Sequence, residues 1–90
     1  MKRHDQYFVY IVTCKNGTFY TGYTNDLKKR IESHNKGTGA KYLRGKGPIE
    51  LVYFKEYRYY KNALKAERET KKLTRGQKEE IVKKHASKKI

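Results

Sequence analysis

The feature that most constrains the fold is a strand-like run at residues 7–14, YFVYIVTC, followed directly by a turn signal. β-Branched and aromatic residues fill this run without the polar alternation of a half-exposed strand, which is typical of a strand buried on both faces. Lys15-Asn16-Gly17 then provides a hairpin turn, and TFYTGY at residues 18–23 returns as a second strand. This part of the chain is therefore predicted to be a β-hairpin with its first strand inside a sheet.

The hairpin can adopt two registers, and these place its tyrosines differently. A two-residue Asn-Gly turn, the commoner choice, would send Tyr10 and Tyr20 to opposite faces of the hairpin. A three-residue loop that ends on Gly17, with that glycine at positive φ, would pair Tyr10 with Gly22 and put both tyrosines on one face. A glycine opposite Tyr10 would also leave room for a ligand or another backbone. The sequence alone leaves both registers open.

The rest of the chain alternates between helical and strand-like patterns. The expected elements, in order, are a helix at 27–35 capped from 24–26 and stopped at Gly37, a glycine-rich loop at 37–48, a strand at 49–54 or as far as 57, a helix at 60–73, a break at Gly76 and a short helix at 77–85. This order predicts an α/β (α+β) fold, with a small three-stranded, mainly antiparallel sheet flanked by two to three helices. We expect a single domain over residues 1–90, with a core of about 6–75 and a basic C-terminal helix and tail at 76–90.

Positive charge is spread along the whole chain. Lys and Arg number 23 against 9 Asp and Glu, which gives a formal net charge of +14. A surface this basic favours a polyanionic partner, most often nucleic acid, over an ordinary solvated surface. So high a charge with few aliphatic residues would also suit a disordered chain, but 9 tyrosines supply large rings for a core. We therefore expect a folded domain that binds nucleic acid.

Several other classes of protein are excluded by what the sequence lacks. A length of 90 residues leaves no room for a separate cofactor-binding domain, so we expect no small-molecule cofactor. No apolar run approaches the ~20 residues of a membrane helix, and the first residues lack the apolar segment of a signal peptide. The single cysteine, Cys14, cannot form an internal disulfide. We expect a cytoplasmic protein that binds no membrane.

Three polar residues are expected on helix faces that should otherwise be buried. Arg30 and His34 flank an apolar pair on the inward side of the first helix, and Glu67 lies on or beside the buried stripe of the second. Each has a structural explanation: a snorkelling arginine, a partly exposed histidine capping a helix end, and a carboxylate paired with a lysine four residues on. Taken singly, each structural explanation is the better one. Their combination with Tyr10 and Tyr20 points to a site.

Five short segments follow one another in a distinctive order. They are Phe8-Val9-Tyr10, Tyr20-Thr21-Gly22, the helix carrying Arg30 and His34, GAKYLRGKGP at 39–48, and ALKAERETKKL at 63–73 with Glu67. In this order and spacing they resemble the GIY-YIG nuclease superfamily, and the last two are similar to the small stand-alone bacterial members of an uncharacterised, UPF-type family. The resemblance covers about residues 6–75. Phe8 stands where the motif has its first glycine.

The resemblance implies a fold, a reaction and a role for each residue. Members have a three-stranded antiparallel sheet flanked by helices and cut phosphodiester bonds. By position, Tyr10 and Tyr20 match the motif tyrosines, Arg30 and His34 the pair on the first helix, and Glu67 the ligand of one Mg²⁺ ion. In the mechanism proposed for the family, a tyrosine activates water, the arginine steadies the charged transition state and the metal stabilises the leaving oxygen. One carboxylate and one fork of guanidinium donors suit this phosphate chemistry.

Basic residues close to the expected site are candidates for nucleic-acid binding. They are Lys41, Arg44 and Lys46 in the glycine-rich loop, and Lys71 and Lys72 near the end of the second helix. Contacts with the phosphate backbone and a merely solvated basic loop are equally good explanations of the first three.

The sequence thus supports two functions. The first is a Mg²⁺-dependent DNA endonuclease of the GIY-YIG type, and the second is a small basic DNA- or RNA-binding protein with the same fold and little or no catalysis. Glu67 with Arg30 separates them, because a carboxylate in a basic cleft repels phosphate and is of no use to a pure binder. We expect target choice to come from the domain itself or from a protein partner, and binding to weaken steeply with salt.

Overall fold

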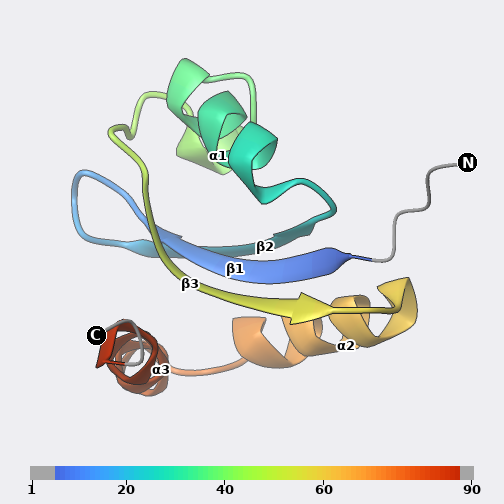
Figure 1. Cartoon of the computed structure of the whole chain (residues 1–90). Coiled ribbons are helices and arrows are strands. Elements are labelled where there is room, and N and C mark those ends of the chain that lie inside the picture. Colours follow the sequence, from blue (N-terminus) through green and yellow to red (C-terminus); the bar gives the residue numbers. More distant parts are fainter. Residues whose placement is uncertain (1–5, 88–90) are drawn as a thin grey trace, which may run out of the picture.

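The computed structural model of the chain describes residues 6–87. Its elements are β1 (Tyr7–Thr13), β2 (Phe19–Thr24), α1 (Leu27–Lys36), the short 3₁₀ helix η1 (Lys41–Leu43), β3 (Glu50–Tyr57), α2 (Tyr60–Lys71) and α3 (Arg75–Ser87). The strands form one antiparallel sheet in the order β2-β1-β3. α1 covers one face of the sheet, and α2 and α3 lie against the other (Figure 1). This is the predicted α+β fold, and no helix within residues 6–87 is long and apolar enough to cross a membrane.

The first hairpin adopts the three-residue register. Tyr10 pairs with Gly22, and Gly17 closes the loop with φ at 87°, a conformation that favours glycine. Tyr10 and Tyr20 therefore project from the same face of the sheet. The register that a shared tyrosine site requires is confirmed, and the commoner two-residue turn is not formed.

Alternation along β1 divides the core between the two faces of the sheet. On the α1 face, Tyr10 and Val12 pack with Leu43 and Ile49, and all four side chains are buried. The intervening residues of β1 face α2, and Ile11 among them is fully buried. The central strand is thus apolar on both sides, as its continuous apolar run predicts.

Both ends of α1 are fixed by residues that the sequence singles out. The Asp26 side chain accepts a hydrogen bond from the Lys29 N–H at 3.1 Å, which satisfies one unpaired donor of the first turn. Gly37 ends the helix in the left-handed conformation, with φ at 81°. Between these caps, Arg30 is half-buried and His34 is buried, so both face the sheet as expected.

The glycine-rich segment between α1 and β3 is more ordered than the sequence suggests. An irregular loop is expected at 37–48, but η1 lies within it. Leu43, at the end of η1, is only 1% exposed and belongs to the core on the α1 face. A helix of three residues is too short to leave a periodic pattern, and for that reason the sequence does not reveal it.

The break before the last helix lies earlier than expected. α2 ends at Lys71 and α3 begins at Arg75, so Gly76 lies in the first turn of α3 and does not separate the helices. The new start is made by Thr74 and Gln77, because the side chain of each accepts a hydrogen bond from the backbone N–H of the other. This reciprocal pair is a capping box, and it starts a helix more effectively than a lone glycine stops one.

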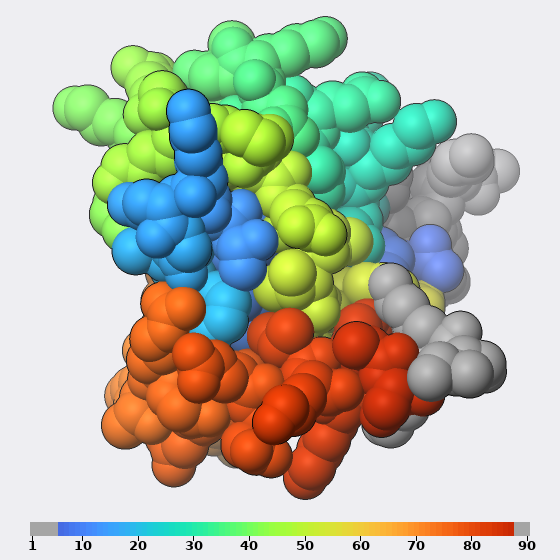
Figure 2. Space-filling view, turned by 90° about the vertical axis from the view of Figure 1, so that its left-hand side faces the viewer, coloured from blue at the N-terminus to red at the C-terminus, as the bar shows by residue number. Residues whose placement is uncertain are grey.

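The start of α3 is attached to the turn of the hairpin. The Arg75 guanidinium donates to the Gly17 carbonyl at 2.9 Å and lies over the Phe19 ring at 4.7 Å. Figure 2 shows this side of the molecule, with the hairpin turn (blue) next to the junction of α2 and α3 (orange to red). The α2–α3 layer is therefore joined to the sheet through the hairpin turn as well as through the strands.

Gly22→Ala is predicted to destabilise the fold. A Cβ at this position would lie 2.6 Å from the Tyr10 hydroxyl oxygen and 3.2 Å from the Tyr20 ring. Because Tyr10 is fully buried and cannot move aside, we expect the free energy of unfolding to fall by about 1–3 kcal/mol. Gly76→Ala is the matched control, since its Cβ would meet nothing closer than 4.0 Å in a helix, and it should gain up to about 1 kcal/mol. Urea denaturation measures both, and a Gly22→Ala protein as stable as the natural one would contradict this packing.

Candidate active site

Three of the expected site residues meet at the Tyr10 hydroxyl. Tyr10 projects from β1 across Gly22 toward α1, and its Oη lies 2.8 Å from His34 Nε2 and 3.4 Å from Arg30 Nε. Arg30 and His34 are one turn apart on α1, so a single hydroxyl can contact both. His34 is only 2% exposed, and the alternative of a partly exposed histidine capping the helix end is therefore wrong.

The two partners of the His34 ring determine which nitrogen carries its proton. The Ala40 N–H donates to Nδ1 at 3.3 Å, so the neutral ring holds its proton on Nε2. Burial, and after it the charge of Arg30, lower the pKa of His34, so the ring is neutral at pH 7. His34 Nε2–H therefore donates to Tyr10 Oη. A Cβ at Gly39 would clash with Nδ1, so the backbone there also restricts the ring.

The Tyr10 oxygen accepts two hydrogen bonds and leaves its own proton unused. Both bonds, from His34 and from Arg30, come from N–H donors, and no group within residues 6–87 accepts the Tyr10 proton. Burial raises the pKa of Tyr10 above its ordinary value of 10, although the hydrogen bond and charge of Arg30 act against this rise. The hydroxyl is thus protonated at neutral pH, while its oxygen already faces the donors that a phenolate needs. The two donors would therefore stabilise the phenolate form of Tyr10 if the proton were lost.

Tyr20 lies beside this group and is supported from η1. Its ring meets the His34 ring edge-on at 5.8 Å and stacks on Tyr42 at 6.0 Å, with only 17° between the two planes. Lys46 Nζ lies 3.9 Å from the centre of the Tyr42 ring. Tyr42 is 49% exposed, and sequence reasoning missed it because an irregular segment offers no periodic signal. A row of aromatic rings therefore connects half-buried Lys46 to buried His34.

Glu67 comes from the opposite layer of the molecule. It lies on α2, which covers the other face of the sheet from α1 (Figure 1), and its side chain is 12% exposed. Lys71 Nζ pairs with Glu67 Oε2 at 3.2 Å, so the ion pair offered as the structural explanation is present. After burial, which is the main cause, the charge of Glu67 also contributes to the raised pKa of Tyr10. Glu67 is thus near the Tyr10 group electrostatically but makes no direct bond with it.

The donors around Glu67 can be compared with what Mg²⁺ requires. Within residues 6–87 no cluster of three or more His, Cys, Asp or Glu could hold an ion. Mg²⁺ is commonly held by one or two carboxylates together with substrate phosphates and water. Within residues 6–87 the buried Thr21 hydroxyl has no hydrogen-bond partner. Thr21 lies on the face of the sheet that α2, the helix of Glu67, covers. Within the described residues Glu67 is thus a single carboxylate, and a Mg²⁺ ion there would need phosphate and water as its other ligands.

The basic residues expected to bind nucleic acid fall into two groups. Lys41 and Arg44 are exposed and Lys46 is half-buried, and all three lie on or next to η1. Lys71 and Lys72 lie at the end of α2, in the other layer, and Lys71 is engaged in an ion pair. Only the first group is brought to the side of the sheet that carries Tyr10.

Known proteins share this sequence pattern. Residues 6–80 match the sequence pattern of the GIY-YIG family, described as "GIY-YIG catalytic domain". The chain belongs to the GIY-YIG family. It is 51% identical over 75 residues to a UPF0213 protein of Clostridium perfringens, covering 83% of this chain and 81% of that protein. It is also 47% identical over 79 residues to a UPF0213 protein of Staphylococcus aureus, covering 88% and 96%.

Two solved structures share the fold. The solution NMR structure of the UPF0213 protein BH0048 from Bacillus halodurans is 45% identical, with a TM-score of 0.57 over 87% of this chain and 83% of that one. The solution NMR structure of the protein EF2693 from E. faecalis is 38% identical, with a TM-score of 0.61 over 93% and 90%. A GIY-YIG catalytic domain indicates nuclease activity, nucleic-acid binding and a general dependence on divalent metal.

The stability of this GIY-YIG domain should depend on a neutral His34. Histidine in the unfolded chain titrates near pH 6.5, whereas burial lowers the pKa of His34 in the folded protein. Below about pH 6.5 the unfolded chain binds a proton that the folded protein does not, so the free energy of unfolding should fall as the pH drops. Urea unfolding at a series of pH values should show a smaller decline for His34→Gln. The natural protein and His34→Gln share the other two histidines. An equal decline of the free energy of unfolding in the two proteins would therefore contradict a buried, neutral His34.

Proposed function

We propose that the protein is a Mg²⁺-dependent endonuclease that hydrolyses phosphodiester bonds in DNA. The observation that carries this proposal is the buried Tyr10 hydroxyl, which accepts from His34 at 2.8 Å and from Arg30 at 3.4 Å while its own proton is unused. A tyrosine with a purely structural role would normally spend a buried proton on a protein acceptor. An unused proton on an oxygen that accepts from two donors instead supports a role in proton transfer.

In this proposal Tyr10 is the general base. A water molecule that attacks a phosphate must lose a proton, and the phenolate form of Tyr10 can take it. The two N–H donors stabilise the phenolate, with His34 as a neutral donor and Arg30 as a charged one. Tyr20 is a positioning residue, because its ring packs against the edge of His34.

Arg30 and Glu67 act on the phosphate rather than on the water. Arg30 uses only Nε on Tyr10, so its remaining N–H groups can bind phosphate oxygens as a fork. Glu67 is the residue that would hold Mg²⁺, with phosphate and water as further ligands. When bound, the metal supplies Lewis-acid neutralisation of the charge on a phosphate oxygen. Before a metal binds, the ion pair with Lys71 neutralises the charge of the Glu67 carboxylate.

The proposed nuclease binds DNA through the basic surface next to η1. Lys41, Arg44 and Lys46 lie on the side of the sheet that carries Tyr10, and Tyr42 adds an exposed ring. Contacts of this kind neutralise phosphates without reading sequence. In a single domain over residues 1–90, working in the cytoplasm, target choice then comes from the shape of the DNA or from a protein partner.

A second candidate is a nucleic-acid-binding protein that does not cleave. The Glu67–Lys71 ion pair favours this candidate, because it gives the carboxylate a structural partner in place of a metal. Phe8, in place of the first glycine of the motif, also departs from the nuclease pattern. The aromatic and basic surface beside η1 would then be a binding platform.

Glu67→Gln distinguishes the two candidates. The assay is cleavage of linear, nicked, branched and single-stranded DNA in Mg²⁺ and in EDTA. We expect the natural protein to cut at least one of these substrates in Mg²⁺ only, and Glu67→Gln to lose all cleavage while its DNA affinity stays equal or rises, because a repulsive carboxylate is gone. Glu69→Gln, which removes an exposed carboxylate from the same helix, is the matched control and should cleave normally.

Two results would contradict the nuclease proposal or its metal site. Normal cleavage by Glu67→Gln would show that Glu67 is not the metal ligand. If that variant also melted at a lower temperature, the role of Glu67 would be its ion pair with Lys71 alone. A natural protein that binds these DNAs but cuts none of them would leave the binding function in place of the nuclease.

A further inference from the structure

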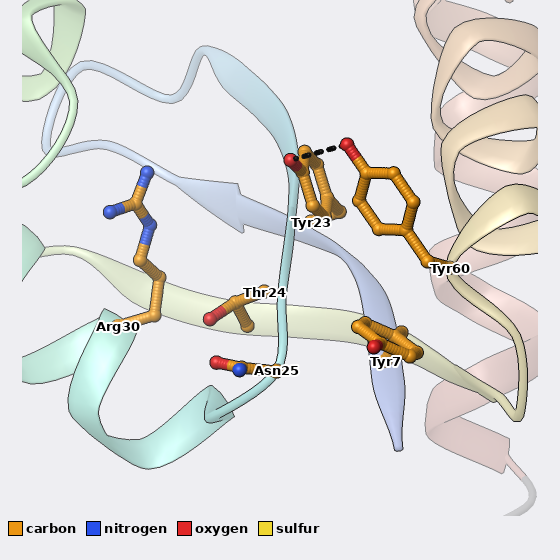
Figure 3. Close-up of a pocket in the computed structure, with 6 residues that line it drawn as sticks. All are labelled: Tyr7, Tyr23, Thr24, Asn25, Arg30 and Tyr60. Atoms are coloured by element: carbon orange, nitrogen blue, oxygen red, sulfur yellow. Dashed lines mark hydrogen bonds between the residues drawn. The ribbon is translucent and has the colours of Figure 1, made fainter. Parts of the chain in front are cut away.

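A recess beside Arg30 contains, apart from Arg30 itself, none of the residues that meet at the Tyr10 hydroxyl. Its lining consists of Tyr7, Tyr23, Thr24, Asn25, Arg30 and Tyr60, and it has a volume of about 410 Å³, within the range of about 300–1,000 Å³ found for small-molecule sites. Figure 3 shows Arg30 at one end, Tyr7 and Tyr60 at the other, and Thr24 and Asn25 between them. This tyrosine pocket is built from both helical layers, from the edge strand β2 and from the start of β1.

Three rings form the aromatic wall of the tyrosine pocket. Tyr60 meets Tyr7 and Tyr23 edge-to-face, in each case with the ring centroids 5.7 Å apart, and the Tyr23 and Tyr60 hydroxyls are 3.3 Å apart. Neither contact is a flat stack, so each covers only part of a ring face. Tyr60 is 47% exposed despite its size. The wall therefore offers a stacking surface to a flat aromatic ligand.

Two polar groups of the pocket have hydrogen-bonding capacity to spare. Within residues 6–87 the Asn25 carboxamide makes no hydrogen bond to protein, and the Arg30 guanidinium uses only Nε. A carboxamide can donate to and accept from the edge of a base, and a guanidinium binds phosphate oxygens. An aromatic wall, a carboxamide and a guanidinium with unused N–H groups together have the chemistry of a nucleotide site.

We propose that the tyrosine pocket binds one unpaired nucleobase of the nucleic acid, next to the phosphate that Arg30 holds. The inference rests on the proposed function in one respect, namely that the phosphate on Arg30 is the one to be cleaved. Arg30 provides the link, because the same side chain contacts Tyr10 and lines the pocket. A base stacked on Tyr60 brings its neighbouring phosphate to Arg30, and so to the side of Tyr10.

The pocket would select the kind of nucleic acid that is bound. A base within a duplex is paired and stacked, and it must be extruded before it can enter. A base in a single strand, a flap or a branch is already unpaired and enters without that cost. Every base has a π face, so stacking does not discriminate among the four. The substrate class is therefore a nucleic acid with an unpaired nucleotide beside the bound phosphate.

Binding in the absence of metal tests the pocket directly. The affinity of the natural protein is measured in EDTA for a short single-stranded DNA and for the same strand made abasic at its central positions. Both ligands carry the same number of phosphates, so the general attraction of a protein with a net charge of +14 is equal for the two. We expect the abasic strand to bind about fivefold more weakly or worse, the lower end of the loss for one stacked base.

Neighbouring tyrosines supply a matched pair of variants. Tyr60→Ala removes the exposed wall of the pocket, and it should lower the affinity for the normal strand to that for the abasic strand. Tyr59→Ala removes a tyrosine that is 60% exposed and does not line the pocket, and it should keep the natural preference. Tyr60→Phe keeps the ring and should also keep the preference. Tyr60→Leu removes the ring but keeps an apolar side chain and should lose the preference, and it tests the pocket in case Tyr60→Ala folds poorly.

The possible results separate the pocket from the nuclease function. Equal affinity of the natural protein for the two strands, or equal losses in Tyr59→Ala and Tyr60→Ala, would overturn the pocket. The assay contains no metal and detects no cleavage, so its result does not depend on catalysis. If the protein cuts DNA but binds the normal and the abasic strand equally, only the proposed pocket is contradicted. If the protein prefers the normal strand, with Tyr60 required, but cuts no DNA, the pocket is supported and the nuclease function is contradicted.

Discussion

The hydrogen bond between the Tyr10 hydroxyl and the His34 ring joins the sheet to α1, and much of the surrounding structure depends on it. A buried polar group left without a partner costs about 1–3 kcal/mol, so both members of this pair must be held in place. Tyr10 reaches His34 only because Gly22 has no side chain, and His34 keeps its orientation because the Ala40 N–H holds Nδ1. The register of the hairpin, the end of α1 and the start of the η1 segment are therefore constrained by one contact.

Features that depend on nearby residues could be predicted from the sequence. The apolar run of β1, the caps Asp26 and Gly37 of α1, and the inward spacing of Arg30 and His34 all correspond to the structure. Capping and periodicity act over a few residues, so a single sequence contains what they need. The hairpin register required more information, because turn statistics favour two residues. The loop of three residues follows from the packing of Tyr10, which is a tertiary contact.

Features that depend on distant contacts could not be predicted in this way. Tyr42 stacks on Tyr20 from a segment without periodicity, and Tyr23 meets Tyr60 only once α2 lies against the sheet. The layer that carries Glu67 is not predictable from helical spacing. That spacing identifies the buried face of a helix but not the layer that the helix joins. The family resemblance placed Glu67 in the site by sequence position, whereas the structure connects it to Tyr10 only through its charge.

The proton of Tyr10 is at the centre of the proposed reaction, and the single-turnover rate of DNA cleavage by Tyr10→Phe is its most direct test. Phenylalanine keeps the ring in the core and removes only the hydroxyl. We expect cleavage to fall by about 10²–10⁴-fold, the range of general-base catalysis, with DNA affinity in EDTA unchanged. The natural protein should cleave faster as the pH rises from neutral, because burial raises the pKa of Tyr10 and keeps the phenolate scarce. A Tyr10→Phe protein that cleaves at the natural rate, with the same dependence on pH, would contradict the assignment of Tyr10 as the base.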